Sequence, residues 1–400
     1  MSDKRKFDMA SDRFSYNSSV RKPETLLRLD QVERTVSLCK RTEIIRDGKK
    51  FPVFQKPCVI GVFSVDENRR FLPNESQLKY LYWNKSSEEP TCKKVKFDLN
   101  EGIKHCVRKD ESVNEKLDHI FCWLRAEGNQ KEECVKADII CFRGLLTTIM
   151  STPYEQQEGW IICATKRNNT IFLCAFDTEK RIRERKNATE KLKTFQSWGY
   201  KFEQFMLAEE PGQEPDTKRP VVEAEELACV FRSKLNSHSL VYVAEMDGVH
   251  SDEPVDAAAL KSNIVSFVEL KTSRHIETQR QDTNFKRYKL LKWWCQSFLV
   301  GIETIYCGFR DDDGIVSTIK EYKVRDLPKM AKGLWDPCVC MNFCAQFLDF
   351  VKTCVQESTN QDALWKFEWT PGNSIMGREV NRNSEFAFVP DWYSADATQQ

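Results

Sequence analysis

Two apolar segments of the chain each end in a pair of charged side chains. Glu245 and Asp247 close the segment LVYVAEMDGV. Glu269 and Lys271 close the segment IVSFVELKT. Side chains of a β-strand alternate between its two faces, so the two charges of each segment point the same way. The residues before them are apolar on both faces, which is typical of strands inside a sheet. Charges at such buried strand ends need a partner, because desolvating them alone is costly.

A divalent cation is one partner that these carboxylates could share. Mg²⁺ prefers hard oxygen ligands, namely a few carboxylates together with water and substrate phosphate. An aspartate followed some twenty residues later by Glu-x-Lys on the next strand is the layout of the (D/E)-x-K nuclease superfamily, in which the acids bind metal and the lysine lies beside the attacking water. Asp247 and the pair Glu269 and Lys271 have this spacing. The alternative is a structural salt-bridge cluster in which Lys271 neutralises the glutamates.

A fourth carboxylate, Glu203, lies in the segment EKLKTFQSWGYKFEQFM. The apolar residues of this segment recur at helical spacing and include Leu192, Phe195, Trp198, Phe202 and Phe205. Glu203 follows Phe202, so it lies beside this apolar stripe. Gly199 precedes it by one helical turn, and a glycine there costs about 1 kcal/mol relative to alanine. We therefore expect something to approach the helix closely at Gly199. An ordinary glutamate at the edge of a buried face is the alternative.

Strand and helix signals alternate along the rest of the chain without a strict βαβ rhythm. We expect helices over 112–128, 190–206 and 285–299, strands on both sides of the polar turn 167–169, and a hairpin over 304–322. In the first helix we expect one face to carry Val113, Leu117, Ile120, Phe121 and Leu124. This pattern predicts an α+β or mixed-sheet fold in one domain. We expect residues 1–25 to be a disordered tail and residues 26–395 to form that domain.

The composition limits the class of protein. The chain is 40% hydrophobic and 11% aromatic, which is ample for a packed core. We find no window that approaches the roughly 20 apolar residues of a membrane helix. The N-terminus has no apolar core of a secretory signal, so we expect the chain to stay inside the cell. Its 16 cysteines are scattered through apolar stretches, as reduced cysteines are. With 61 basic and 60 acidic residues, only a local basic groove or bound cations could attract a polyanion.

Several longer strings resemble the decapping and exoribonuclease (DXO) family. They are RGLLTTIMSTPYEQQEGW, GYKFEQ, AEMDG, VELKTS, KLLKWWCQSFL, CGFRDDDG and DPCVCMNFCAQFL. The resemblance runs from about residue 62 to 392. It implies a single mixed α/β domain with two β-sheets flanked by helices and a (D/E)-x-K nuclease-like core. It also implies hydrolysis of RNA 5′ ends: removal of incomplete or NAD caps, release of pyrophosphate from 5′ triphosphates, and 5′→3′ degradation.

The resemblance also assigns roles to residues. Two divalent ions, Mg²⁺ or Mn²⁺, would be held by the carboxylates and one main-chain carbonyl of Glu203, Glu245, Asp247, Glu269 and Leu270. Lys271 would orient or activate the water, and Gln296 would contact the reacting phosphate. Lys289, Lys292 and Gln296 recur at helical spacing, which would suit a phosphate backbone. The phosphates would also be met by Phe142, Arg143 and Gly144.

Three further substrate contacts are implied at Arg69, Glu115 and Ala228. For Glu115 the motif Ser112-x-x-Glu115 offers another explanation, because it fits a helix capping box. At Ala228 the relatives carry a cysteine, and this difference hardly matters if the contact there uses the main chain.

Two other functions stay open from the sequence. Some relatives have lost catalytic acids, and some fungal members bind and stabilise a separate 5′→3′ exoribonuclease, so a catalytically weak scaffold is one alternative. A DNA nuclease of the wider superfamily is the other. We expect RNA 5′ ends as partners, with a 5′→3′ exoribonuclease as a second partner, and no membrane. We expect the nucleus as the main location and the cytoplasm as a second one.

Overall fold

The computed structural model describes residues 33–36, 50–83, 92–110, 112–128, 135–262, 264–358, 360 and 362–396. All of them fall within one compact unit, Val32–Gln400. The expected tail, residues 1–25, lies outside the described residues.

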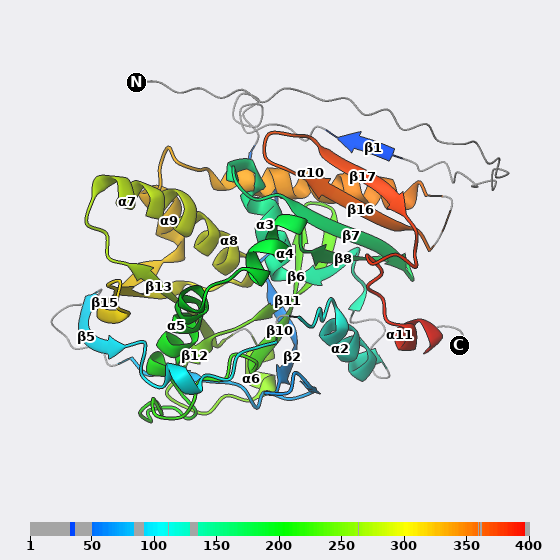
Figure 1. The fold of residues 1–400 in the computed structure, drawn as a ribbon. Helices are drawn as coiled ribbons and strands as arrows, with labels where there is room; N and C mark the ends of the chain where they lie inside the picture. Colours follow the sequence, from blue (N-terminus) through cyan, green and yellow to red (C-terminus); the bar gives the residue numbers. More distant parts are fainter. Residues whose placement is uncertain are drawn as a thin grey trace, which may run out of the picture. The chain divides into compact units, whose positions relative to one another are not determined.

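Two mixed β-sheets organise the described residues (Figure 1). The ten-stranded sheet runs in the order β1 (Glu33–Val36), β17 (Ile375–Val380), β16 (Leu364–Trp369), β7 (Trp160–Arg167), β8 (Thr170–Phe176), β6 (Ile139–Phe142), β11 (His238–Glu245), β10 (Glu226–Leu235), β2 (Cys58–Val65) and β3 (Phe71–Leu72). The seven-stranded sheet runs in the order β5 (Cys92–Asp98), β15 (Ile315–Lys323), β14 (Thr304–Arg310), β13 (Ser266–Arg274), β12 (Gly248–His250), β4 (Tyr80–Leu81) and β9 (Leu207–Ala208).

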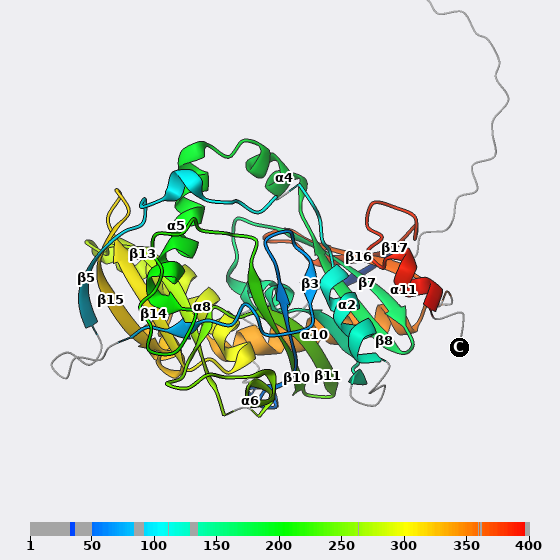
Figure 2. The same ribbon diagram turned by 90° about the horizontal axis from the view of Figure 1, so that it is seen from below.

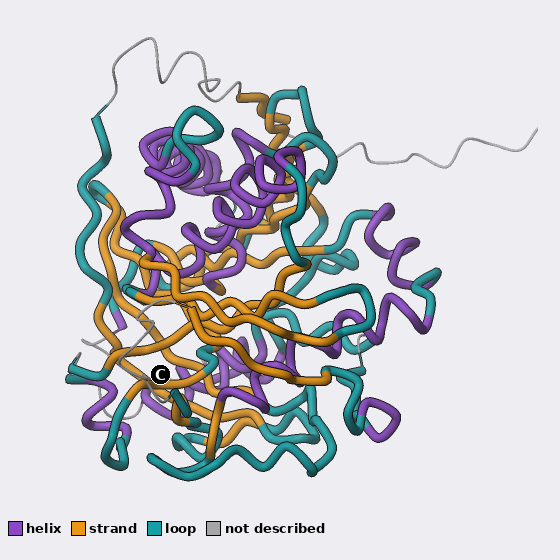
Figure 3. Tube along the Cα trace, turned by 90° about the vertical axis from the view of Figure 1, so that its left-hand side faces the viewer, coloured by secondary structure: helices purple, strands orange, loops and turns teal. Residues whose placement is uncertain are grey.

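Helices cover these sheets, and Figure 3 shows them gathered around the central strands. They are α2 (Asp118–Gly128), α3 (Arg143–Ser151), α4 (Glu179–Lys186), α5 (Glu190–Met206), α6 (Ala257–Lys261), α7 (Gln279–Asn284), α8 (Leu290–Val300), α9 (Leu327–Met330), α10 (Pro337–Gln356) and α11 (Asp391–Asp396). A π-helical turn, Phe285–Lys289, joins α7 to α8, and short 3₁₀ turns lie at Ile103–His105, Thr152–Tyr154 and Val324–Asp326.

Three buried clusters hold the layers together. The largest contains side chains of both sheets together with helices α3, α8 and α10. A second cluster joins α2 to the other face of the ten-stranded sheet. The third joins α5 to the seven-stranded sheet, where the ring of Phe202 lies against Gly308 of β14. A Cβ at Gly308 would come within 2.5 Å of that ring, so only glycine lets α5 approach this closely.

The two segments that carry the acids are both interior strands, as expected, but they are not neighbours. β11 pairs with β6 and β10 in the ten-stranded sheet. β13 pairs with β12 and β14 in the seven-stranded sheet. The chain leaves the ten-stranded sheet after Glu245. It enters the seven-stranded sheet with the three-residue strand β12. β12 lies between β11 and β13 along the chain, so Glu269 and Lys271 are not on the next strand as the spacing suggested, and the acids come from two different sheets.

Most other expected elements are present. α5 has the expected bounds, the turn between β7 and β8 uses Asn168 and Asn169, and Gly314 closes the hairpin of β14 and β15. The helix expected over 112–128 begins only at Asp118. Val113 therefore lies outside the helix, and it is 59% exposed instead of facing the core.

One helix corrects the interpretation of apolar windows. α10 is long and apolar enough, by length and composition, to cross a membrane. It is also a core helix of this fold, because 61% of its most apolar window is buried against other parts of the chain. Fourteen described cysteines are free, and nine of them are buried as small apolar side chains, three of these on α10.

Candidate active site

The acids Glu203, Glu245, Asp247 and Glu269, with the cations Lys271 and Arg143, form a group that we call the acidic site. Glu245 is the last residue of β11 and continues the face of Val241 and Val243, which are buried toward α2. Asp247 follows in the short link to β12. It therefore lies beyond the strand end at which the sequence placed it.

Glu269 and Lys271 lie on β13 of the other sheet. Leu270 between them packs into the cluster of Trp198 and Phe202 from α5, so the two charged residues point from the opposite face. Glu269 is 2% exposed, and its carboxylate is paired with the Lys271 ammonium. The main-chain N–H of Leu270 donates a 2.6 Å hydrogen bond to Asp247 Oδ2. This bond ties the link after β11 to the middle of β13.

Arg143 completes the cationic side of the acidic site. It is the first residue of α3, and its Nη1 lies 3.6 Å from Glu269 Oε2. This nitrogen is buried and has no hydrogen-bond partner among the described residues. Phe142 is half-buried at the helix N-cap, whereas Gly144 is exposed and no atom lies within 4 Å of where its Cβ would be. The first turn of α3 thus has free space beside a cation, an arrangement that suits an anion.

The acids of this site influence one another through their charges. Burial and the negative charges of Asp247 and Glu245 raise the pKa of Glu203 well above its usual range. Solvent reaches Glu245, but displacement of water by the surrounding protein, followed by the charges of Glu226 and Asp247, raises its pKa to about 8. Burial and the charge of Glu269 raise the pKa of Asp247 to about 6. The acidic site is therefore short of positive charge.

The remaining two groups behave as a matched ion pair. Burial would raise the pKa of Glu269, but the charges of Lys271 and Arg143 outweigh it and hold that pKa below its usual range. Burial would lower the pKa of Lys271, but the charges of Glu269 and Asp247 outweigh it and raise that pKa. Both groups are therefore charged at neutral pH, and Lys271 is a permanent cation beside the other acids.

The donors of the acidic site fit a hard divalent cation in their chemistry. All are oxygens, and the raised pKa values of Asp247 and Glu245 are what an added positive charge would lower. Their present geometry is less complete, because no three Asp, Glu, His or Cys side chains in the described ranges are grouped closely enough to hold a metal ion. Glu269 is held by Lys271, and Asp247 by the Leu270 N–H. The metal ligands, Leu270 included, therefore stay a prediction.

Gln296 lies on α8, which packs against α3, the helix that Arg143 begins. α8 contacts α3, and Gln296 is half-buried on it. Lys289 donates to the Thr272 carbonyl and to Ser273 Oγ, both at 3.2 Å, so it points at β13 beside Lys271. Lys292 is exposed and lies 4.0 Å from Glu155. Lys289 ends the π-helical turn and Lys292 and Gln296 follow on α8, so the three residues keep their helical spacing, and their contact with a phosphate backbone stays a prediction.

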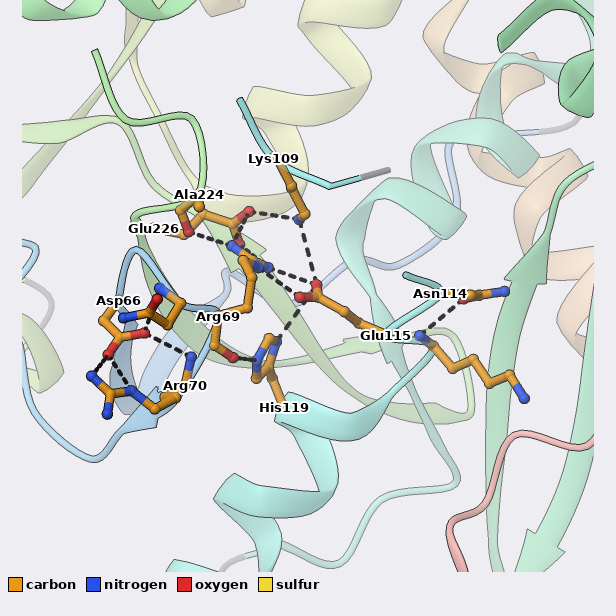
Figure 4. Close-up of polar contacts among 11 residues, drawn as sticks. Asp66, Arg69, Arg70, Lys109, Asn114, Glu115, His119, Ala224 and Glu226 are labelled. Carbon is orange, nitrogen blue, oxygen red and sulfur yellow. Dashed lines mark hydrogen bonds and ion pairs between the residues drawn. The ribbon is translucent and has the colours of Figure 1, made fainter. Parts of the chain in front are cut away.

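A second group of charges lies next to the acidic site, and we call it the arginine cluster (Figure 4). The guanidinium of Arg69 donates two hydrogen bonds to Glu115, of 2.6 and 2.7 Å. It also donates 2.6 Å to the Ala224 carbonyl and pairs with Glu226 at 2.8 Å. Lys109 bridges the two carboxylates at 3.4 Å from Glu115 and 3.0 Å from Glu226. Arg69 has a φ of 61°, which is uncommon for a residue with a side chain.

This cluster explains Glu115 without a capping box. Ser112 bonds to Asp110 instead, and the helix begins only after Glu115. The capping explanation was therefore wrong, and the Glu115 carboxylate is taken up by Arg69 and Lys109. Whether Arg69 and Glu115 also contact substrate stays a prediction.

β10 connects the arginine cluster to the acidic site. Glu226 begins this strand, and Ala228, two residues later on the same face, lies directly opposite Glu245 on β11. Ala228 is buried, so its side chain is not open to a ligand. Sequence reasoning did not single out Glu226 or Lys109. The alternation of ELACVFRSKL, with its only acid two residues before Ala228, was the available signal for Glu226.

Two more residues were missed beside Glu203. Tyr200, one helical turn earlier on α5, and Lys79 line a cavity of about 50 Å³ together with Glu203. Burial and the nearby charges of Glu245 and Glu203 raise the pKa of Tyr200, so its hydroxyl stays protonated. The spacing of Tyr200 and Glu203 could have indicated a shared face, but nothing in the sequence points to Lys79.

Comparisons with known proteins place this arrangement. The family described as RAI1 like PD-(D/E)XK nuclease matches residues 55–394. The human "Decapping and exoribonuclease protein" is 36% identical over 360 residues, which are 87% of this chain and 87% of that protein. The Drosophila melanogaster "Decapping and exoribonuclease protein Rai1" is 31% identical over 354 residues, which are 86% of this chain and 92% of that protein.

Solved structures share the fold at lower identity. Candida albicans Rai1 in complex with pU5-Mn²⁺ has a TM-score of 0.74 and 21% identity, and the match covers 92% of this chain and 100% of that one. S. pombe Rai1 in complex with 3′-FADP has a TM-score of 0.66 and 23% identity, and the match covers 88% of this chain and 100% of that one. These likenesses confirm the mixed α/β fold with two sheets flanked by helices.

Proposed function

The chain belongs to the RAI1 like PD-(D/E)XK nuclease family and is a hydrolase of the RNA decapping nuclease kind, and on this premise we propose that it serves RNA 5′-end quality control. It removes incomplete caps and NAD caps, releases pyrophosphate from 5′-triphosphate RNA, and degrades the RNA body 5′→3′. The resemblance to the DXO family is confirmed by the curated relatives, whereas these separate activities are our proposal.

The observation that carries the proposal is the acidic site itself. Four carboxylates, which come from two sheets, the link between them and one helix, influence one another's pKa values, and two half-buried cations face them. Such perturbed acids with specific charge partners are typical of functional sites. The Mn²⁺ of the Candida albicans Rai1 complex supports a divalent ion in this fold. We infer two ions, Mg²⁺ or Mn²⁺, held by the four carboxylates and the Leu270 carbonyl. When bound, such ions supply Lewis acidity and an activated water.

The chain's own residues supply the rest of the chemistry. Lys271 is charged at neutral pH and places positive charge where a phosphodiester gathers negative charge during hydrolysis. Arg143 Nη1 is ion-paired with Glu269 but makes no hydrogen bond to a described residue, so the guanidinium can bind a substrate phosphate together with the first turn of α3. Gly144 leaves room there, next to Phe142 at the helix N-cap, and Gln296 offers an amide from α8. The Ala228 main chain borders this region from β10, and Arg69 and Glu115 border it from the segments that precede β3 and α2.

The scaffold alternative has no observation in its favour. A chain that only stabilised another 5′→3′ exoribonuclease would not need the four acids with Lys271 and Arg143, and all six are present and coupled. An exoribonuclease partner and a nuclear location, with the cytoplasm as a second compartment, fit the proposed activity on capped RNA. The basic residues Lys4, Arg5 and Lys6, which could act in nuclear import, lie outside the described residues.

The test is hydrolysis by the purified full chain with Mg²⁺ or Mn²⁺. RNAs of one sequence carry a 5′ monophosphate, a 5′ triphosphate, an incomplete cap or an NAD cap, and the products are resolved as pyrophosphate, cap dinucleotide or mononucleotides. We expect turnover that is lost with chelator and in the variant Asp247→Asn. Preference for matched DNA over RNA contradicts the proposal, and so does full activity of Asp247→Asn.

A further inference from the structure

The corner between α4 and α5 carries a concentration of exposed positive charge. No residue of α4 is buried, and its sequence EKRIRERK has five basic and three acidic or apolar residues. Figure 2 shows α4 at the edge of the molecule beside the first turns of α5, away from the strands. A helix that is polar nearly all round has no core to face, so packing does not account for its charges.

Two of these cations have no acidic partner. Within the described part of the chain, no carboxylate lies in ion-pair range of Arg183 or Lys186, and Arg183 bonds only to a main-chain carbonyl, at 3.3 Å. Others are paired, for example Lys180 with Glu158. Arg183 and Lys180 line a hollow of about 560 Å³ between the two helices, together with Glu184, which lies 3.8 Å from Lys180. Leu192 of α5 forms its apolar side, and Arg183 is the cation there without an acidic partner among the described residues. This volume lies in the range of small-ligand sites, and a cation beside an apolar surface suits a nucleotide with its phosphate.

An uncovered strip of α5 leads from this hollow to the acidic site. Leu192, Gln196, Gly199 and Glu203 follow one another at spacings of three and four residues, so they lie on one face of the helix. Leu192 is 47% exposed, Gln196 is exposed, and no atom lies within 4 Å of a Cβ placed on Gly199. The distance from Leu192 to Glu203 is roughly 16 Å at about 1.5 Å per residue. A single nucleotide bound at Glu203 does not span it, whereas a chain of roughly five stacked nucleotides does.

We propose that the α4–α5 hollow is a docking site for the single-stranded RNA body, which runs along the open strip of α5 while the 5′ end occupies the acidic site. This proposal rests on the proposed RNA hydrolysis, because that function places the 5′ end in the acidic site. It also answers how a chain of net charge +1 holds a polyanion, because the local basic groove lies here. A two-nucleotide RNA reaches only the acidic site, and a long RNA reaches both.

The test compares two RNA lengths with identical 5′ ends, two and twenty nucleotides. The variant Arg183→Glu/Lys186→Glu reverses both unpaired cations on a helix without buried residues, so the fold is retained. Lys56→Glu/Lys234→Glu is the matched control, since both lysines are exposed. Lys234 lies near the C-terminal end of β10, whereas Glu226 of the arginine cluster begins that strand. We expect the test variant to bind the long RNA about tenfold more weakly and to lose about one unit of salt slope, as expected for lost phosphate contacts. Turnover of the short RNA stays within twofold of the wild type.

Four other results would each overturn the inference. These results are unchanged binding of the long RNA, an equal loss in the control variant, an equal loss on the two-nucleotide RNA, and no binding of the long RNA by the wild type. Binding is measured by fluorescence anisotropy with chelator present, so it does not depend on hydrolysis. A wild type that binds the long RNA through this corner but cleaves no RNA would contradict the proposed function alone.

Discussion

The acidic site and the arginine cluster contain the same types of charged residue but differ in their charge balance. In the arginine cluster two cations, Arg69 and Lys109, meet two carboxylates, Glu115 and Glu226, and the charges balance. In the acidic site four carboxylates meet two cations, and the pKa values of Glu203, Glu245 and Asp247 are raised. A balanced group holds the chain in place, whereas a group short of positive charge is ready to accept it from a ligand.

The two regions also differ in what their arginines do. Arg69 uses its guanidinium fully, on two carboxylates and a main-chain carbonyl, and this network fixes an uncommon backbone conformation. Arg143 lies 3.6 Å from the Glu269 carboxylate, and its buried Nη1 makes no hydrogen bond to any described residue. A buried donor without a hydrogen bond costs free energy, and a substrate phosphate beside the acids would supply the missing acceptor. We therefore expect changes at Arg69 to act first on structure and changes at Arg143 to act first on substrate.

The largest effect should come from removing the cation of the acidic site. Lys271→Met keeps the length of the side chain but leaves Glu269 with only Arg143. We expect the rate of RNA hydrolysis at saturating RNA to fall about 10²- to 10³-fold, because a charge that stabilises the transition state is lost. Stopped-time assays with 5′-labelled RNA measure this, and circular dichroism checks the fold. A loss of less than tenfold would move Lys271 to a structural role like that of Lys109.

In the arginine cluster, removal of one charge should lower the stability of the fold before it affects hydrolysis. Glu115→Gln keeps the shape of the side chain but removes the charge that accepts from Arg69. We expect the free energy of unfolding to fall by about 1–3 kcal/mol, as for a charged hydrogen bond that loses its partner in a partly buried setting. Urea denaturation measures it. If Glu115→Gln instead keeps its stability and loses hydrolysis as Lys271→Met does, the two regions are one catalytic unit.

This division was only partly visible in the sequence. The periodicity of α5 predicted both of its ends, and alternation on β11 and β13 identified Glu245, Glu269 and Lys271, because these patterns are local. Glu115 was ambiguous, since its neighbours allow a capping box and only a residue 46 positions away, Arg69, decides against it. Lys79 was invisible for the same reason, as its place beside Glu203 depends on tertiary packing alone.

The relation of the two sheets could not be predicted either. β11 and β13 follow closely along the chain, which favours pairing within one sheet. The switch depends on two link residues, Met246 and Asp247, and on a strand of three residues, β12, which is too short to give a periodic signal. Adjacency in sequence therefore predicted the right acids and the wrong strand order.

The pH dependence of stability should separate the two regions by sign. The pKa of Glu245 is raised to about 8 and that of Asp247 to about 6, so without metal their favourable contribution is present below their usual values and is lost as pH rises toward 8. The pKa of Glu115 is lowered, so its contribution is present above its usual value near 4.5 and is lost as pH falls below it.

Thermal unfolding with chelator from pH 3.5 to 8.5 tests these signs. Glu245→Gln should flatten the decline between pH 5 and pH 8 and leave the acid limb unchanged. Glu115→Gln should do the reverse. In the wild type, bound Mn²⁺ should remove the decline at high pH, since the ion replaces the protons. One common response of both variants would contradict the assignment of two electrostatic regions.

The smallest expected effect concerns two glycines that border α5. A Cβ at Gly199 meets no atom within 4 Å, so Gly199→Ala should raise the free energy of unfolding by about 0.5–1 kcal/mol through helix propensity. Gly308→Ala is the contrasting variant, because its Cβ would press on the Phe202 ring and lower stability. Urea denaturation ranks both against the wild type. If Gly199→Ala stabilises as expected and Gly199→Leu weakens binding of the twenty-nucleotide RNA but not turnover of the two-nucleotide RNA, then helix stability was given up at this position to keep the strip open. Equal effects of Gly199→Leu on both RNAs would instead tie Gly199 to Glu203 and the acidic site.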